Sequence, residues 1–243
     1  MRTAAILPVK RFSAAKSRLG ASGVAETLRQ RLARAMVTDV LHALAQTDSI
    51  ELTIVVTREQ SFAELAAEHD ALLIADTAED GQSAAVALGV QRALANGIER
   101  VLCIPGDCPA LDPAELDALL ADADARAASA LRSRPDDRSG DGAEVTIVPD
   151  RHGAGTNGLL LTPPDAIEPA FGPGSCERHA KLARAAGARC QIERLPSLLL
   201  DVDTGADLAA LQDRLGATRA AAVRTRAVLG QPERNQIVAV NGD

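Results

Sequence analysis

Residues 3–19 read TAAILPVKRFSAAKSRL and carry the strongest indication of the fold. The apolar run at the start of this stretch, Thr3–Val9, is typical of a strand that is buried on both faces of a parallel sheet. A loop with four cations follows directly: Lys10, Arg11, Lys16 and Arg18. Because ligands of parallel α/β sheets bind beyond the carboxyl ends of the strands, we expect this loop to meet a ligand, and a polyphosphate suits its charge. The alternative is a solvated basic loop.

Strand-like and helix-like segments alternate along the rest of the chain. Apolar side chains at four-residue steps predict an amphipathic helix over residues 24–44. Further strands are predicted over residues 52–56, 71–74, 101–104, 144–148 and 158–161, with extended segments over 190–195 and 198–202. Further helices are predicted over residues 61–69, 83–95, 113–126, 176–186 and 204–215.

This alternation predicts an α/β fold, a doubly wound and mostly parallel sheet with helices on both faces. The polar stretch at residues 133–142 is interpreted as a surface loop, so residues 1–216 form a single domain. Residues 217–243 are predicted to add a helical extension and a flexible C-terminal tail.

Composition excludes several classes of protein. The 243 residues are 47% hydrophobic and 24% charged, as in an ordinary globular protein. A net charge of −7 and an aromatic content of 1% argue against binding to nucleic acid, through either the phosphate backbone or base stacking. No signal peptide or membrane-spanning run is found, so we expect a cytoplasmic protein without a membrane partner. The oligomeric state is left open.

Three acidic residues lie within or just after predicted extended segments. Asp107 comes after the strand at 101–104, and Asp201 and Asp203 are two residues apart, which in an extended strand places both on one face. Carboxylate oxygens suit a hard divalent cation such as Mg²⁺. For Asp203 alone, a role at a helix N-terminus is an equal alternative.

Two glycine-rich loops are candidates for anion binding. Residues 153–158, GAGTNG, contain Thr156 as a hydroxyl donor, and residues 171–175, FGPGS, precede a helix that Ser175 would cap. In both loops we expect free backbone amides to face an anion, although tight turns without a ligand are the alternative. A third loop before a helix could meet a purine edge or simply cap the helix: Asp80, Gly81, Gln82 and Ser83.

Over about residues 4–211 the sequence resembles the MobA-like nucleotidyltransferases, and within them the CofC/FbiD guanylyltransferases of coenzyme F420 biosynthesis. The motifs that carry the resemblance are LPVKRFSAAKSRL (7–19), GDCPAL (106–111), GAGTNGLLL (153–161), FGPGS (171–175) and LLLDVDTGADL (198–208).

The resemblance implies a fold like that of nucleotide-diphospho-sugar transferases. It implies transfer of GMP from GTP to phosphoenolpyruvate with release of diphosphate; 2-phospho-L-lactate and 3-phospho-D-glycerate are alternative acceptors. The transferase that consumes the product in F420 biosynthesis would be a partner.

The resemblance also implies roles for individual residues. Thr156, Gly172 and Ser175 would hold the acceptor, while Asp107, Asp201 and Asp203 would hold Mg²⁺. Lys10, Lys16 and Arg18 would be the catalytic residues that meet the GTP phosphates. The remaining nucleotide-binding residues would be Asp80, Gly81, Gln82, Ser83, Pro105, Gly106 and Asp107.

The sequence departs from the wider superfamily in its first loop, and two alternative functions stay open. The first loop carries Pro8, Val9 and Lys10 where the wider superfamily has a glycine-rich phosphate cradle, so the sequence does not say how the triphosphate is held. A molybdopterin-type cytidylyl- or guanylyltransferase is one alternative, and the missing glycine cradle counts against it. A catalytically silent nucleotide-binding protein is another. The three acidic residues argue against the second, because a silent site has no chemical need of them.

Overall fold

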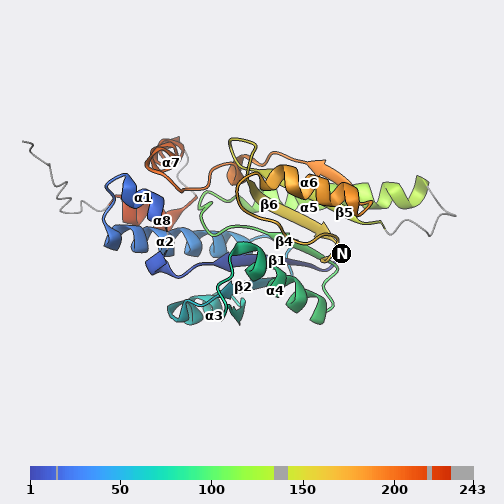
Figure 1. Cartoon of the computed structure of the whole chain (residues 1–243), viewed down its shortest axis with the longest axis horizontal. Coiled ribbons are helices and arrows are strands. Elements are labelled where there is room, and N and C mark those ends of the chain that lie inside the picture. Colours follow the sequence, from blue (N-terminus) through green and yellow to red (C-terminus); the bar gives the residue numbers. More distant parts are fainter. Residues whose placement is uncertain (15, 134–141, 218–220, 231–243) are drawn as a thin grey trace, which may run out of the picture.

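The computed structural model describes residues 1–14, 16–133, 142–217 and 221–230. Within these residues, seven strands form one sheet in the order β3-β2-β1-β4-β6-β5-β7 (Figure 1). The strands are β1 (Thr3–Val9), β2 (Leu52–Thr57), β3 (Leu72–Ala75), β4 (Arg100–Cys103), β5 (Glu144–Pro149), β6 (Thr156–Thr162) and β7 (Arg189–Ile192).

The sheet is mostly parallel, which confirms the predicted fold class. Strand β1 lies inside the sheet, beside the middle strand β4, with Ala4 opposite Leu52 of β2 on one side and Val101 of β4 on the other. Strand β6 runs antiparallel to both β4 and β5. The chain between β5 and β6 is only residues 150–155, too short for the crossover that parallel neighbours require, so these two strands form a hairpin.

Helices cover both faces of the sheet. One apolar core lies against α2 and α5, including Leu41 and Leu120, and the other lies against α4 and α6, including Val86 and Ala180. The helices are α1 (Ser17–Ala21), α2 (Glu26–Ala45), α3 (Ala63–Glu68), α4 (Gln82–Ala95), α5 (Pro113–Ser133), α6 (Ser175–Ala185), α7 (Gly205–Ala217) and α8 (Val223–Leu229). Short 3-10 turns are η1 (Phe12–Ala14), η2 (Gln60–Phe62) and η3 (Pro196–Leu198).

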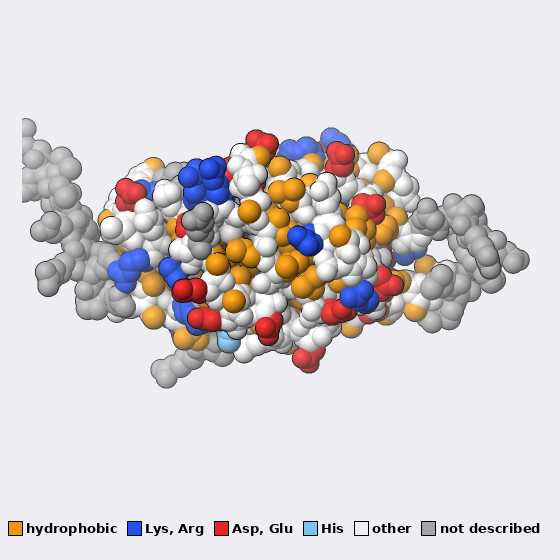
Figure 2. Space-filling model, turned by 90° about the horizontal axis from the view of Figure 1, so that it is seen from below, with side chains coloured by type: hydrophobic (Ala, Val, Ile, Leu, Met, Phe, Trp, Pro, Cys, Tyr) orange, Lys and Arg blue, Asp and Glu red, His pale blue; other side chains and the backbone are white. Residues whose placement is uncertain are grey.

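Helices α3 and α4 lie at the bottom of Figure 1, and Figure 2 shows this underside directly. Apolar side chains gather near the middle of this face and charged side chains surround them. Strand β3 and helix α4 contribute exposed apolar side chains, among them Leu73, Leu88 and Leu94. In the described part of the chain, no helix is long and apolar enough to cross a membrane.

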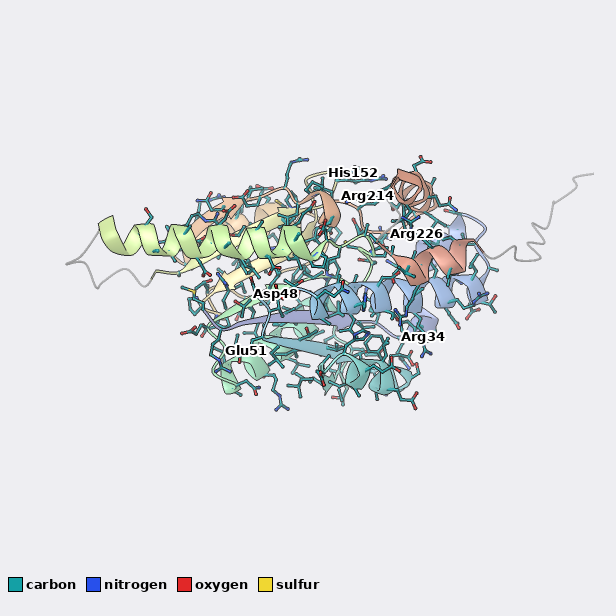
Figure 3. The ribbon with its side chains drawn as sticks, turned by 180° about the vertical axis from the view of Figure 1, so that it is seen from behind. Arg34, Asp48, Glu51, His152, Arg214 and Arg226 are labelled. Atoms are coloured by element: carbon teal, nitrogen blue, oxygen red, sulfur yellow. The ribbon has the colours of Figure 1, made fainter. Side chains whose placement is uncertain are left out.

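Helix α8 packs against α2, as Figure 3 shows with Arg226 on α8 and Arg34 on α2. The carboxylate of Asp39 accepts hydrogen bonds from the backbone amides of Arg224 (3.0 Å) and Thr225 (2.8 Å), so a residue of α2 satisfies the first turn of α8. The division at residue 216 stays a prediction, and most of the predicted tail, 231–243, lies outside the described residues.

Two local predictions differ from the structure or fall beyond it. The extended segment predicted over 198–202 is wrong: Pro196 begins the turn η3, and the chain continues as an irregular loop into α7. Proline favours this because it fixes φ and brings no N–H to a strand ladder. Of the surface loop predicted over 133–142, residues 134–141 lie outside the described residues.

Candidate active site

A cavity of about 1000 Å³ opens at the carboxyl ends of the central strands. It brings together loops that are far apart in the sequence, namely those after β1, β3 and β4, the β5–β6 loop, and the segments that lead into α6 and α7. Most of the predicted site residues line it: Lys10, Lys16, Arg18, Gly81, Gln82, Pro105, Gly106, Asp107, Thr156, Gly172, Ser175, Asp201 and Asp203.

Two predicted nucleotide-binding residues, Asp80 and Ser83, are not among the lining residues. The hydroxyl oxygen of Ser83 accepts a hydrogen bond of 2.9 Å from the backbone amide of Phe171. Ser83 thus joins the start of α4 to the FGPGS loop. In this structure it holds a loop of the site in place and does not line the cavity itself.

Lys16 lies between two of the three acidic residues. Its Nζ is 2.5 Å from Asp107 Oδ2 and 3.2 Å from Asp203 Oδ1, and its side chain is only 8% exposed. Burial disfavours the charged amine, but the charges of Asp107 and Asp203 outweigh burial and raise the pKa of Lys16 above its usual value. The backbone of Lys16 is left-handed (φ 57°), which turns the chain from the basic loop into α1.

The other cations of the first loop lie in three different environments. Lys10 is exposed and lines the cavity. Arg18 is 73% exposed and its Nη2 lies 3.2 Å from Asp203 Oδ2. Arg11 is not simply solvated: its Nε and Nη2 donate to the two carboxylate oxygens of Glu79, at 2.9 and 2.6 Å. This pair joins the loop after β1 to the loop before α4, a contact that sequence spacing does not reveal.

Asp107 has one carboxylate oxygen that suits a cation. Its Oδ1 is buried and has no hydrogen-bond partner among the described residues, while Oδ2 accepts from Lys16. Gly106 makes this position possible, because a Cβ at residue 106 would lie 2.7 Å from Val37 Cγ2 on α2. A buried carboxylate oxygen without a donor is costly, and a metal ion would satisfy it.

Asp201 is held by Asn157, whose Nδ2 donates to Asp201 Oδ1 (3.1 Å) and to the carbonyl of Leu198 (2.7 Å). Burial and the nearby charge of Asp107 raise the pKa of Asp201. The three acidic side chains line one cavity, yet the described residues contain no group of three or more acidic, histidine or cysteine side chains arranged to hold a metal by themselves. Mg²⁺ does not require such a cage, since it is usually bound by one or two carboxylates together with substrate phosphates and water.

The β5–β6 loop does not leave its amides free, contrary to the prediction. The carboxylate of Asp150 accepts hydrogen bonds from the amides of His152 (3.0 Å), Ala154 (3.0 Å) and Gly155 (2.9 Å). The carboxylate of Asp150 therefore binds the amides that were predicted to bind an anionic ligand. Thr156, at the start of β6, keeps its side chain at the cavity.

The FGPGS loop is shaped by two glycines with positive φ, Gly172 (110°) and Gly174 (72°). Ser175 does not cap α6 with its side chain; Gly174 is the capping residue and Ser175 is the first residue of the helix. Among the described residues, the amides of Gly172 and Gly174 have no hydrogen-bond partner, and both glycines line the cavity. Here the predicted anion-binding amides are available.

Several residues of this site were missed by sequence analysis. His179 lies behind the FGPGS loop, and Arg178 braces that loop by donating to the carbonyls of Ala170 (3.0 Å) and Phe171 (3.3 Å). Arg151 lines the cavity and forms an ion pair of 2.6 Å with Asp207. Figure 3 shows its neighbour His152 at the upper edge of the molecule, on the same side as Arg214 of α7. For Arg151, the only indication of a role in the site was its position beside the glycine-rich loop that begins at Gly153.

Three solved structures support the fold class. This chain is similar to a protein assigned as a nucleotide-diphospho-sugar transferase from Desulfovibrio desulfuricans (TM-score 0.66, 18% identity, 94% of each chain). It is also similar to a nucleotidyl transferase from Methanothermobacter (TM-score 0.57, 21% identity, 89% of this chain and 98% of the other) and to a cytidylyltransferase from Leptospira borgpetersenii (TM-score 0.57, 13% identity, 94% of each). At these identities the likeness shows the fold alone.

The family model and the relatives identify the chain as a nucleotidyltransferase with this sheet and cavity. The model of the MobA-like NTP transferase domain matches residues 17–222, and the chain belongs to this family. It is 48% identical to a phosphoenolpyruvate guanylyltransferase from Conexibacter woesei, over 95% of this chain and 96% of the relative. A protein of the same name from Sphaerobacter thermophilus is 36% identical, over 86% of this chain and 91% of the relative.

Proposed function

We propose that this chain transfers GMP from GTP to phosphoenolpyruvate and releases diphosphate, as a step of coenzyme F420 biosynthesis. The observation that carries the proposal is that one cavity has two differently lined parts. Cations and carboxylates line one part, and the FGPGS loop and the hydroxyl groups of Thr156 and Ser175 line the other. The names of the relatives, which match over nearly their whole length, supply the nucleotide and the acceptor. The partner that consumes the product stays a prediction.

The cavity divides into two subsites under this proposal. The nucleotide subsite takes the loop before α4 and the segment after β4, with Gly81, Gln82, Pro105 and Gly106. The acceptor subsite takes Thr156, Gly172 and Ser175. The two meet at the acidic residues, where the α-phosphate of GTP must lie for the two substrates to react.

Asp107, Asp201 and Asp203 are the residues that would hold Mg²⁺, and the buried unpartnered Oδ1 of Asp107 is the observation that supports this assignment. When bound, Mg²⁺ supplies charge neutralisation for the phosphates and orients them. Lys16, held between Asp107 and Asp203, and Arg18, beside Asp203, add positive charge at the same place.

The reaction needs orientation and charge neutralisation from this chain, and no general base. An oxygen of the acceptor's phosphate, already ionised at neutral pH, attacks the α-phosphorus of GTP. A new P–O bond forms there as the bond to the bridging oxygen of the β-phosphate breaks, and diphosphate leaves with that electron pair. The product is a phosphoanhydride, and the cations of the first loop stabilise the departing charge.

An acceptor panel tests this function. We expect the protein with GTP and Mg²⁺ to form a guanylylated product and diphosphate from phosphoenolpyruvate, detected by mass, in preference to 2-phospho-L-lactate or 3-phospho-D-glycerate. CTP and ATP serve as nucleotide controls. Preference for CTP would favour the cytidylyltransferase alternative, and the absence of product with every pair would contradict the proposed function.

A further inference from the structure

Three buried polar side chains meet at the acceptor part of the cavity. Thr156 and Ser175 line the cavity, whereas His179, on α6, is fully buried and does not. The Nδ1 atom of His179 lies 3.1 Å from Thr156 Oγ1, and Ser175 Oγ lies 3.1 Å from the same oxygen. The ring of Phe171, which lines the cavity, packs against the imidazole in a T-shaped arrangement with centroids 5.0 Å apart.

The backbone fixes the proton of this imidazole. The amide of Ala170 donates a hydrogen bond of 2.9 Å to His179 Nε2, so Nε2 must hold a lone pair. Burial, together with the charge of Arg178, lowers the pKa of His179 to about 4, so the ring is neutral at physiological pH. A neutral ring with a lone pair on Nε2 carries its proton on Nδ1, which therefore donates to Thr156.

The Thr156–Ser175 pair has one hydroxyl proton that a ligand could use. A hydroxyl oxygen has two lone pairs and one proton, and Thr156 Oγ1 accepts from His179 and from Ser175. The proton of Thr156 then has no acceptor among the described residues. If the bond between Thr156 and Ser175 runs in the opposite direction, the proton of Ser175 is left over instead. In both arrangements the pair offers one O–H group to the cavity.

We propose that His179 is a positioning residue for the acceptor: by donating Nδ1–H to Thr156, it keeps the Thr156–Ser175 pair a hydrogen-bond donor toward the cavity. The pair then selects an acceptor that places an anionic oxygen, of a phosphate or carboxylate, at this point. With a lone pair on Nδ1, Thr156 would turn its proton to the imidazole and present lone pairs that repel the anion. The inference rests on the proposed function, which places the acceptor here.

Two substitutions separate this role from simple packing. His179→Asn puts an amide near the position of Nδ1 and keeps the donor to Thr156, whereas His179→Gln reaches the position of Nε2 and keeps only the bond to Ala170. We expect calorimetry to show phosphoenolpyruvate binding weakened about 10-fold or more in His179→Gln and less than about threefold in His179→Asn, with GTP affinity unchanged in both. Only His179→Gln removes the donor that keeps the proton of Thr156 directed at the anion, and a hydrogen bond to a charged group depends on that proton. His42→Gln, at an exposed histidine of α2 outside the cavity, is the control.

Equal weakening in both variants, or none in His179→Gln, would overturn the proposal. Nitrogen-15 spectra of the unliganded protein give an independent readout: we expect Nδ1 of His179 to be protonated and Nε2 to be bare, and the reverse overturns the proposal. Binding of phosphoenolpyruvate without any turnover would count against the proposed function alone. A wild-type protein that binds no phosphoenolpyruvate would overturn both, whatever the spectra show.

Discussion

Lys16 Nζ donates a hydrogen bond of 2.5 Å to Asp107 Oδ2, and this pair joins the loop after β1 to the loop after β4. These loops follow two neighbouring parallel strands, so the pair lies where the sheet directs its ligands. The amine is almost fully buried while Asp107 keeps 24% exposure toward the cavity. The arrangement holds a cation in place before any phosphate enters.

Removing the amine should therefore destabilise the protein. Because Lys16→Met leaves a partly buried carboxylate without its partner, we expect the free energy of unfolding to fall by about 1–3 kcal/mol, less than for a fully buried pair. Adding Asp107→Asn should recover part of the loss. Urea titration in the absence of Mg²⁺ measures the four proteins of this cycle, and strictly additive effects would contradict a coupled pair.

Mg²⁺ removal and loss of an acidic residue should act alike. We expect EDTA to abolish turnover and Asp203→Asn to lower kcat at least ~100-fold, since metal ligation supplies several kcal/mol to the transition state. Asp213→Asn, an exposed residue of α7 outside the cavity, makes the same charge change as a control. Full turnover in EDTA would exclude the metal assignment.

Arg18 and Arg11 should differ in their effect on the nucleotide. Arg18→Ala is expected to weaken GTP binding roughly 10- to 100-fold, the range for a charge-assisted hydrogen bond. Arg11→Ala should change it less than about threefold, because Arg11 is engaged with Glu79 and Arg58 also contacts that carboxylate at 3.3 Å. Calorimetry at two salt concentrations measures both, and indistinguishable affinities would identify the loop as a solvated one.

Acid should destabilise the protein through His179. Its pKa is about 4 in the folded protein and about 6.5 when unfolded, so below pH 6.5 the unfolded state takes up a proton that the folded state does not. This contribution is intact above pH 6.5 and lost as the pH falls toward 4, at a cost of up to about 3 kcal/mol. Subtracting the stability curve of His179→Asn isolates it, because His69, whose pKa burial also lowers, is present in both proteins. A flat difference curve would contradict the pKa.

Local patterns predicted most of the fold. Apolar periodicity placed β1, α2 and α4 within a few residues of their bounds, because periodicity reports burial of one face of an element. The start of α7 close to the predicted residue 204 also has a local cause: Thr204 Oγ1 accepts from the amide of Asp207, whose carboxylate accepts from the amide of Thr204. The antiparallel direction of β6 was not predicted, because strand pairing is not a local property.

The sequence predicted most of the residues that line the site, but few of the contacts between them. Spacing identified Asp201 and Asp203 correctly as cavity residues but for the wrong reason, since they lie in an irregular loop and not in a strand. The use of the β5–β6 amides by Asp150 and the pairing of Arg11 with Glu79 depend on which groups meet in space. Composition and spacing carry no information on such pairings.

Isotope transfer tests the central claim most directly. If the acceptor's phosphate attacks the α-phosphorus of GTP within this cavity, phosphoenolpyruvate labelled with oxygen-18 on its phosphate should deliver all of its label to the guanylylated product, and the released diphosphate should carry none. Mass spectrometry of both products measures this. Label in the diphosphate, or GTP consumed while the labelled phosphoenolpyruvate is left unchanged, would contradict the account.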